Sequence, residues 1–539
     1  MNKLSKYIIA CMAGVGALSF SACQKALEEK PYSFYSPENF YKNENDAKAA
    51  INGVYNHLYS YDLYMQPFWN MTILDDDHVS GADWFVGTTG AGNPQAYWGY
   101  SGPWIGSYAV IARACSVIEN VGKMENLNAE LKQRILGEAY FLRGWSYFNL
   151  VQLYGGVPIR TESLSGNNPE TNVPRASVKD TYAQVISDLK EAEAKLYPAG
   201  DPRSGEAGRV TQGVAKAMLA KTYLTMASGS LAGASISVRG GTDNGVYTYQ
   251  KTVVAGLEGL DTKAYYTLAR DKAQEVINSG QYALTQNWNE LWSTAGRNNR
   301  EQMWMIQSLA GSPFMNNLGV YFSARSTFGV GAVWKSNNHY KDYEDQDKRI
   351  LDGVTHNYTT LQGTNIFYPS WEADKYKVVN GVNYNNTGST TAERAYVIKF
   401  SAVADPEVAL SDAFFPIIRY SELYLMVAEA ENEINGPNTV AYQALNTIRR
   451  RVSASDASPN MNVQDFRSFV LAERAREFAL EGIRRFDLIR WGIYLPVMNK
   501  IGTGQNNISK VRNTRNLLFP IPLNELNANT AIIENNPGW

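Results

Sequence analysis

The stretch 137–154, GEAYFLRGWSYFNLVQLY, carries most of the information about the fold. Apolar residues occupy almost every side of a helix drawn through it, and a helix of that kind is buried on most of its faces. Gly155 and Gly156, followed by Pro158, would end the helix. We therefore expect a helix that lies inside the protein, enclosed by other elements.

Further helical segments are expected on both sides of the middle of the chain. Ser177 and Asp180 form a capping pattern. Apolar residues from Val178 to Leu196 then keep the three-and-four spacing of one helix face. Other helices are expected after 208–211, at 264–279 where Gly280 closes the segment, at 420–434, at 439–452 and at 464–483.

The predicted helices pair in a recognisable way. Small residues stand where two backbones would approach, and large residues fill the gaps, which is typical of a tetratricopeptide-like stack of helical hairpins. No strict repeat of one fixed length is visible. Three stretches, 62–105, 228–262 and 310–415, fit long loops better than helices. The sequence thus predicts a mainly α fold: a tetratricopeptide-like helical-hairpin scaffold with long irregular loops and a few short strands.

Composition argues against several classes of function. The 539 residues hold 50 Lys and Arg against 52 Asp and Glu, whereas a nucleic-acid binder needs a strong basic excess. Four scattered histidines argue against a histidine-rich metal site, so neither metal nor cofactor is predicted. Three cysteines cannot form a disulfide framework. Cys115 lies in an apolar run and is expected to be a small buried side chain.

Residues 1–22 are typical of a secretory signal. Lys3 and Lys6 precede an apolar run, 7–20, that is too short to span a bilayer. The run ends in LSFSAC, which is similar to a bacterial lipobox and implies cleavage before Cys23 and lipidation of that residue. An ordinary signal peptide with a chance cysteine is the alternative. Residues 23–40 would then form a lipidated tether, since no other stretch is apolar enough to cross a membrane.

A series of short motifs carries a family resemblance. In chain order they are EAYFLR (138–143), YGGVP (154–158), GRVT (208–211), RYSELYL (419–425), ERAREF (473–478), EGIRRFDLIRWG (481–492), FPIP (519–522) and NPGW (536–539). Each motif alone is weak, but their order and spacing cover nearly the whole mature chain. The sequence resembles the SusD/RagB family of surface nutrient-binding lipoproteins.

The resemblance implies a helical, tetratricopeptide-like fold with an N-terminal region at 41–230 and a C-terminal region at 231–539, both within one compact fold. It implies an outer-membrane lipoprotein that faces the cell exterior. It also implies a partner, a SusC-like TonB-dependent β-barrel transporter, over which the lipoprotein would sit as a lid. The implied ligand is an oligosaccharide or polysaccharide, and in some members a peptide.

The charged run from Glu473 to Arg490 has two interpretations. Glycoside hydrolysis needs two carboxylates, which Glu477 and Glu481 could supply. One of them must then stay protonated in an apolar setting, whereas nearby arginines favour ionisation. We favour structural ion pairs, of Glu473 with Arg476 and of Glu481 with Arg484 or Arg485. The sequence also lacks the H-E-x-x-H, G-x-S-x-G and P-loop motifs, so no enzyme is predicted.

The run Asp75-Asp76-Asp77, with Asp83, raises the question of a structural calcium ion. The spacing is not that of an EF-hand loop. A solvated turn is the interpretation we favour, and calcium stays open as an alternative.

Aromatic residues in the predicted loops are the candidate ligand contacts. Sugar rings stack their C–H faces on flat side chains, while their hydroxyls need amide, carboxylate or guanidinium partners. The candidates are Asp83, Trp84, Phe85, Tyr97, Trp98 and Tyr100 in the early loop, and Trp334, Asn338, Tyr340 and Trp371 in the mid-chain loop, where the family resemblance implies a further aromatic contact. Core packing is the alternative for each aromatic, with ligand contact favoured for Trp84 and Trp98. Trp104 and Tyr108 are expected in the core.

Together with what the resemblance implies, these observations predict a non-catalytic surface lipoprotein that captures glycan and delivers it to a SusC-like transporter. A peptide-import or purely structural lid is the first alternative. A surface glycosidase is the second.

Overall fold

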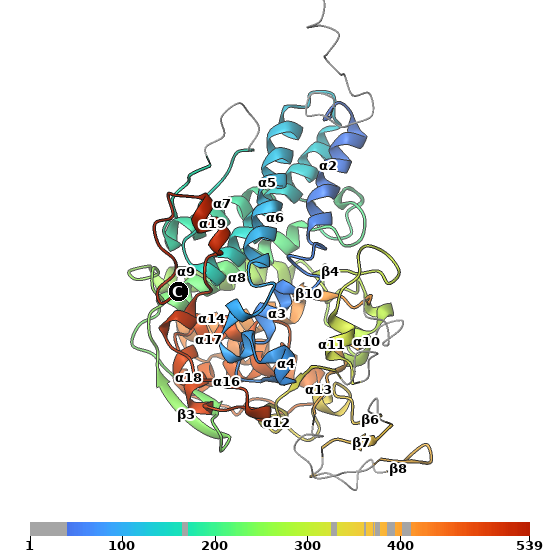
Figure 1. The fold of residues 1–539 in the computed structure, drawn as a ribbon, viewed down its shortest axis with the longest axis vertical. Coiled ribbons are helices and arrows are strands. Elements are labelled where there is room, and N and C mark those ends of the chain that lie inside the picture. Colours follow the sequence, from blue (N-terminus) through green and yellow to red (C-terminus); the bar gives the residue numbers. More distant parts are fainter. Residues whose placement is uncertain are drawn as a thin grey trace, which may run out of the picture.

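The computed structural model describes residues 40–163, 171–324, 331–359, 363–369, 371, 378–384, 394–401 and 411–539. The predicted leader (1–22), Cys23 and all but the last residue of the predicted tether lie outside these ranges. Long helices dominate the fold (Figure 1). They are α2 (Glu44–His57), α5 (Gly102–Lys123), α6 (Ala129–Tyr154), α7 (Val178–Lys195), α8 (Gln212–Ser230), α9 (Thr262–Asn278), α14 (Tyr420–Asn435), α15 (Thr439–Arg451) and α16 (Val463–Glu477).

These helices pack in a tetratricopeptide-like sequence of neighbours. From α5 to α9 each helix contacts the next, α2 lies against α5, α9 contacts α14, and α14 contacts both α15 and α16. Glycines on α6 allow the close approach of α7. A Cβ atom at Gly144 would lie 2.9 Å from the Cβ atom of Asp188, and one at Gly137 would lie 2.9 Å from Leu196. The predicted fold class is therefore confirmed.

Local signals begin and end the helices where the sequence indicated. The side chain of Ser177 accepts a hydrogen bond from the backbone N–H of Asp180 and caps α7. Gly155, with a φ of 75°, ends α6, and Gly280, with a φ of 66°, follows α9. Trp104 and Cys115 of α5 are buried as expected.

The segment predicted as one helix at 464–483 is divided. α16 ends at Glu477, and Leu480 and Gly482 adopt positive φ values of 63° and 74°. A second helix, α17 (Arg484–Arg490), then begins. The single long helix was therefore a wrong prediction, because the left-handed residues turn the chain between the two helices.

Short strands and helices occupy the predicted loop regions. The strands form two-stranded antiparallel pairs: β1 (Val79–Gly81) with β5 (Val333–Lys335), β2 (Ser235–Gly240) with β3 (Gly245–Gln250), β4 (Trp304–Ile306) with β10 (Phe415–Ile418), β6 (Asn357–Thr359) with β7 (Asn365–Phe367), and β8 (Val378–Val379) with β9 (Val382–Asn383). The short α-helices are α3 (Pro67–Ile73), α4 (Asp83–Val86), α10 (Trp288–Trp292), α11 (Leu318–Phe322), α12 (Asn337–Tyr340), α13 (Lys348–Leu351), α18 (Tyr494–Ile501) and α19 (Leu523–Ala528).

The main hydrophobic core draws side chains from distant parts of the chain. Phe141 and Trp145 of α6 both meet Trp304 of β4 edge to face, with ring centroids 5.0 and 5.1 Å apart. Residues of the two predicted regions, 41–230 and 231–539, thus contribute to one core.

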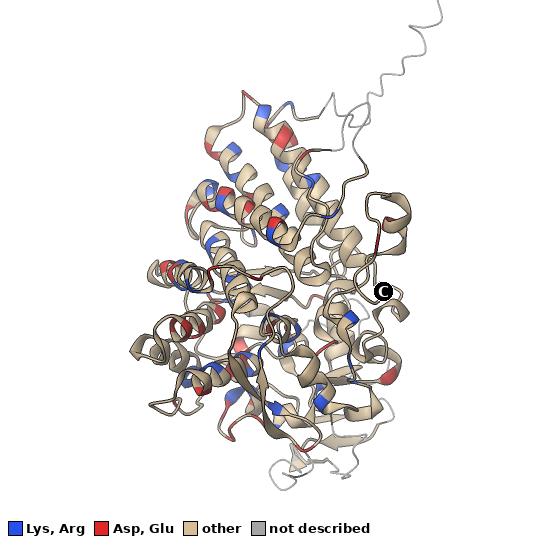
Figure 2. Ribbon diagram, turned by 90° about the vertical axis from the view of Figure 1, so that its left-hand side faces the viewer, with Lys and Arg blue, Asp and Glu red and all other residues tan. Residues whose placement is uncertain are grey.

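Charges of both signs are scattered over the helices of the described chain, without a basic stripe (Figure 2). Within the described ranges no helix combines the length and apolarity that a membrane crossing requires.

Candidate functional site: an aromatic face

Trp84 owes its position to a tight connection between β1 and α4. A Cβ atom at Gly81 would lie 2.2 Å from Val86 and 2.3 Å from the backbone oxygen of Ala332, so only glycine fits there. The backbone N–H of Ala82 donates to that same oxygen. The short helix α4 begins at once and places Trp84 outward, with 65% of its surface exposed, while Phe85 points inward.

Phe85 packs against a residue from a distant part of the chain. Its ring stacks on that of Tyr321 in α11, with centroids 4.0 Å apart and planes 15° apart. The Trp84 ring lies 6.4 Å from the same tyrosine. Figure 1 shows α4 and α11 near each other in the middle of the molecule. Tyr321 therefore supports α4 from beneath and adds its own half-buried ring beside Trp84.

A second exposed tryptophan follows the short 3₁₀ helix η2 (Pro94–Ala96). Trp98 is 57% exposed and stacks on Tyr61, itself 51% exposed, with centroids 4.9 Å apart and planes 24° apart. The buried Tyr97 lies next to it, with ring centroids 5.0 Å apart. Two flat, solvent-facing rings thus stand together.

The phenol groups near the two tryptophans lie within electrostatic range of one another. Burial raises the pKa of Tyr97 far above its usual value, and the nearby phenols of Tyr61 and Tyr321 raise it further. Burial and Tyr61 likewise raise the pKa of Tyr321. We define the aromatic face by its exposed or half-buried rings, Tyr61, Trp84, Trp98 and Tyr321, with Phe85 and Tyr97 beneath them.

Polar groups accompany these rings. Asp83, at the start of α4, is exposed. The side-chain amide of Asn317 donates to Oε1 of Gln66 at 2.8 Å, and its backbone N–H donates to the oxygen of Met65. These contacts fix the start of α11 against the start of α3. The arrangement offers stacking surfaces and hydrogen-bonding groups in place of a nucleophile with its base.

The mid-chain candidates do not join the aromatic face. Trp334 is fully buried under the guanidinium of Arg394, 4.7 Å above its ring, and Tyr340 is 3% exposed. Neither ring has a free face, so their prediction as stacking residues was wrong. Trp371 is 42% exposed, but its neighbours are Tyr340, Tyr368 and Lys341.

The remaining predicted ligand contacts differ in their exposure and location. Phe85 and Tyr97 are buried supports, and Tyr100 is half-buried. Asn338 is half-buried on α12 and lines a separate polar hollow. Sequence reasoning missed Tyr61 and Tyr321. Tyr321 lies within a predicted loop region and Tyr61 lies one residue before another, a position that many core aromatics share.

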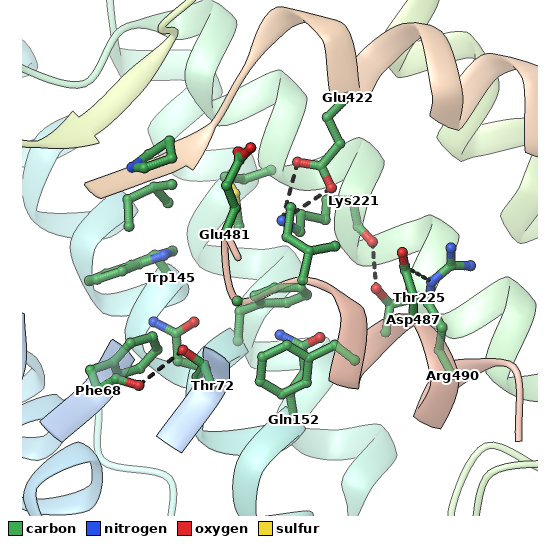
Figure 3. Close-up of a pocket in the computed structure, with 18 of the residues that line it drawn as sticks. Phe68, Thr72, Trp145, Gln152, Lys221, Thr225, Glu422, Glu481, Asp487 and Arg490 are labelled. Atoms are coloured by element: carbon green, nitrogen blue, oxygen red, sulfur yellow. Dashed lines mark hydrogen bonds and ion pairs between the residues drawn. The ribbon is translucent and has the colours of Figure 1, made fainter. Parts of the chain in front are cut away.

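An interior cavity between α6, α8 and α17 is too small for a sugar. It measures about 70 Å³, room for two or three waters at roughly 30 Å³ each. Figure 3 shows Phe68 and Trp145 on one side and charged groups on the other. Those charges are paired within the protein, Lys221 with Glu422 at 3.2 Å and Asp487 with Arg490 at 2.9 Å. This cavity belongs to the core.

The two carboxylates of the glycosidase interpretation are buried in ion pairs. Glu477 bonds to Arg419 at 2.9 Å, to Arg349 at 3.2 Å and to Arg451. Although burial opposes ionisation, these guanidinium groups hold the pKa of Glu477 well below its usual value. Glu481 bonds to Arg419 and Lys399.

The partners predicted for these acidic residues were partly right. Glu473 does pair with Arg476, at 2.8 Å. The pairing of Glu481 with Arg484 or Arg485 was a wrong prediction, because the turn after α16 directs those arginines to aspartates of the early loop.

The aspartate run Asp75–Asp77 is buried, so a solvated turn was also a wrong prediction. Asp75 bonds to Arg512 at 2.8 Å, and Asp77 bonds to Arg484 at 2.6 Å. The carboxylate of Asp76 accepts the backbone N–H groups of His78 and Val79 and so fixes the start of β1. Across the described ranges, no group of three or more His, Cys, Asp or Glu residues could hold a metal ion.

Two family models match the chain. One, described as the SusD family, matches residues 265–539, and the other, described as starch-binding associating with outer membrane, matches residues 25–224. The chain belongs to the SusD family. The matched segments meet at the aromatic face of this SusD-family protein, because Trp84 and Trp98 lie in the segment 25–224 and Tyr321 lies in the segment 265–539.

Known relatives cover most of the chain. A SusD-like protein, P25, of Formosa agariphila is 26% identical over 95% of each chain. The starch-binding protein SusD of Bacteroides thetaiotaomicron is 23% identical over 75% of this chain and 72% of its own.

Solved structures share the fold. A SusD homologue from Bacteroides thetaiotaomicron superposes with a TM-score of 0.74 at 22% identity, covering 93% of this chain and 98% of its own. A laminarin-binding SusD-like protein superposes with a TM-score of 0.66 at 22% identity, covering 93% of this chain and 100% of its own.

Proposed function

We propose that this SusD-family protein is a non-catalytic surface lipoprotein that captures an oligosaccharide or polysaccharide on the aromatic face and delivers it to a SusC-like TonB-dependent transporter. One observation carries the proposal. Trp84 and Trp98, two of the largest apolar side chains, are held open to solvent at 65% and 57% exposure, although the residues next to them, Phe85 and Tyr97, are buried.

A glycan suits such a surface for physical reasons. Sugar rings carry apolar C–H faces that can cover exposed aromatic rings. Their hydroxyl groups can bond to side-chain amides and to carboxylates such as that of Asp83. Trp98 is held by stacking on Tyr61, and Trp84 by an edge-to-face contact with Phe85, so little side-chain entropy would be lost on binding. Starch and laminarin, named for two relatives, support a glucan or similar neutral polysaccharide as the class to test first.

The absence of catalysis rests on the acidic residues. A glycosidase needs one protonated carboxyl group near the bond that it breaks. Glu477 and Glu481 are instead buried in ion pairs with arginine and lysine, away from solvent.

The N-terminal motif and the family description support anchoring at the outer membrane. A lipid on Cys23 would hold the protein at the cell surface, and the tether 23–40 would connect this lipid to the folded part of the chain. The match of residues 25–224 to a family described as associating with the outer membrane supports the same location.

The first test is affinity gel electrophoresis and calorimetry of residues 24–539 against a panel of neutral and acidic polysaccharides. We expect one class to bind, and Trp84→Ala or Trp98→Ala to weaken that binding at least about tenfold, about 1.4 kcal/mol. Trp371→Ala is the matched control, because Trp371 is exposed but stands in another cluster. Binding that survives both substitutions would refute the aromatic face, and binding to peptides alone would favour the peptide-import alternative.

Two further measurements address the partner and the chemistry. Purification from native membranes in mild detergent should bring down a large β-barrel protein, and recovery of the monomer alone would contradict the transporter partnership. Incubation with the polysaccharide that binds should release no reducing ends. Their release would favour the glycosidase alternative.

A further inference from the structure

A polar hollow lies apart from the aromatic face, between the β2–β3 hairpin, α12 and the loop around η7 (Gln505–Asn507). Figure 1 shows β3 and α12 in this lower part of the molecule. The hollow measures about 300 Å³, at the lower end of the roughly 300–1,000 Å³ range of small-molecule sites. A smaller cavity of about 80 Å³ shares four of its lining residues, His78, Arg239, His339 and Asp342. We call the two together the histidine pocket.

Two stacked imidazoles line the histidine pocket. The rings of His78 and His339 lie with centroids 3.8 Å apart and planes 12° apart. Nε2 of His78 is 3.3 Å from the carboxylate of Asp77. His339 is 1% exposed, and neither of its ring nitrogens has a hydrogen-bond partner in the protein.

Their surroundings favour the neutral form of both imidazoles. Burial lowers the pKa of His78 to about 3, with Arg484 adding to the effect and Asp77 opposing it. Burial also holds the pKa of His339 well below its usual value, and His78 and Lys335 lower it further. A neutral imidazole presents one N–H donor and one lone-pair acceptor. Leaving both unpaired in the interior costs free energy, so the ring is arranged for a partner that can both accept and donate.

The remaining polar groups of the pocket are of the same kind. Oδ1 of Asn244 is buried without a hydrogen-bond partner. Nε of Arg239 lies 3.5 Å from Asp342, and this pair presents a donor next to an acceptor. Asn338 holds the hairpin, because its amide donates to the oxygen of Gly241 at 3.2 Å.

Charges around the pocket are balanced. Arg484 pairs with Asp77 at 2.6 Å, and Arg476 pairs with Glu473 at 2.8 Å. The ammonium group of Lys510 donates to the backbone oxygen of Asp76 and lies near the buried aspartates of the early loop. An anion would meet Asp77 and Asp342, and a cation would meet the arginines. A hydroxyl group can accept from one neighbour and donate to another, and so avoids both conflicts.

We propose that the histidine pocket is a second binding site, separate from the aromatic face, for a neutral, hydroxyl-rich ligand about the size of one sugar ring. The volume, the unpaired ring nitrogens of His339, the unpaired side-chain oxygen of Asn244 and the Arg239–Asp342 pair carry this inference. It does not depend on the aromatic face binding a glycan, and the two sites can be tested independently.

The ring nitrogens of the histidines give a direct measurement. The chain has four histidines, His57, His78, His339 and His356, so ¹⁵N-histidine labelling yields four imidazoles, which His57→Gln and His356→Gln help to assign. Residues 24–539 carrying both Trp84→Ala and Trp98→Ala are titrated to high millimolar concentration with glucose, galactose, mannose and xylose, and with glucuronate as an anion. We expect at least one neutral sugar to shift the His78 and His339 signals saturably and to leave those of His57 and His356 in place.

Matched variants then test the site. Asn338→Ala, which removes a lining amide, should weaken the response at least fivefold. Asn289→Ala, an exposed asparagine of α10 outside the pocket, should not change it. Three results would overturn the proposal: no sugar shifting either histidine, which would leave the pocket to water alone; glucuronate binding more tightly than the neutral sugars; or equal responses in the two asparagine variants.

Discussion

The rings of Phe85 and Tyr321 lie almost parallel, with centroids 4.0 Å apart, and they join α4 to α11. Phe85 is buried, while Tyr321 is half-buried and also lies 6.4 Å from the exposed Trp84. One tyrosine therefore fixes the helix that presents Trp84 and forms part of the surface next to it. An aromatic ring at position 321, more than its hydroxyl group, should be what the site requires.

Substitution of Tyr321 separates these roles. Tyr321→Phe keeps the stacked ring and should change the affinity for the bound polysaccharide by less than about threefold. Tyr321→Ala removes the support and should weaken binding about tenfold, because α4 loses a stacking contact worth about 0.5–1.5 kcal/mol as well as buried area. Calorimetry on both variants gives the comparison, and equal losses would show that the hydroxyl group is what matters.

Gly81→Ala should displace α4. The new Cβ atom would lie 2.2 Å from Val86 and 2.3 Å from the oxygen of Ala332, so β1 or α4 must shift. We expect weaker polysaccharide binding even where the protein still folds, since Trp84 follows three residues later. Gly53→Ala is the control: nothing lies within 4 Å of its Cβ position in α2, and it should raise stability by about 0.5–1 kcal/mol. Unchanged affinity in Gly81→Ala would contradict the role of this turn.

Glu477→Gln should destabilise the fold severely. The substitution leaves Arg349, Arg419 and Arg451 short of a buried counter-charge, and breaking such a cluster costs about 3–5 kcal/mol. Urea denaturation followed by tryptophan fluorescence measures the change. Glu130→Gln removes an exposed carboxylate that pairs with Arg203 at 3.4 Å, and it should change the free energy of unfolding far less, because solvent screens this pair. Similar shifts in both variants would mean that the buried cluster adds nothing.

The stability of the protein should fall in acid for an identifiable reason. Burial alone would raise the pKa of Asp487, but the guanidinium groups of Arg474 and Arg490 lower it from 3.8 to about 2. A carboxylate with a lowered folded-state pKa stabilises the fold above its unfolded pKa, and loses that contribution as the pH falls. The loss should therefore occur between pH of about 4 and about 2. Melting temperatures across this window should fall less steeply in Asp487→Asn, and parallel curves would refute the assignment.

Cys23→Ala should abolish acylation. Cells given a clickable fatty acid should label the wild-type protein at the outer membrane and leave the variant unlabelled and released from the membrane fraction. Cys115→Ala serves as the control, because Cys115 is buried and offers no accessible thiol. Label that persists in Cys23→Ala would show that the lipobox interpretation is incorrect.

The sequence predicts the helical scaffold well, because its signals are local. The cap at Ser177 and the left-handed Gly155 act within one helical turn, and the apolar surface of 137–154 states directly that α6 is buried. The break after Glu477 was missed for the opposite reason. Helical spacing of charges continues to Glu481, but the chain turns there so that both glutamates reach Arg419, a contact that no local pattern reports.

The same distinction explains the candidate site. Trp84 and Trp98 could be proposed from the sequence, since each stands beside polar residues in a stretch without helical periodicity. The burial of Trp334 could not, because it depends on β5 pairing with β1. The burial of the aspartate run likewise depends on an arginine 437 residues away, Arg512, which neutralises Asp75.

The hydrogen bond between Gln66 and Asn317 spans 251 residues of sequence, and the Phe85–Tyr321 stack spans a similar length. Contacts between residues so far apart in sequence form slowly, because closing a long loop costs conformational entropy before the contact can stabilise the chain. Helices, whose contacts are local, form early. The aromatic face should therefore be among the last parts to assemble during refolding. The recovery of polysaccharide binding during refolding would therefore report the final stage of folding. Far-ultraviolet circular dichroism would report the earlier formation of the helices.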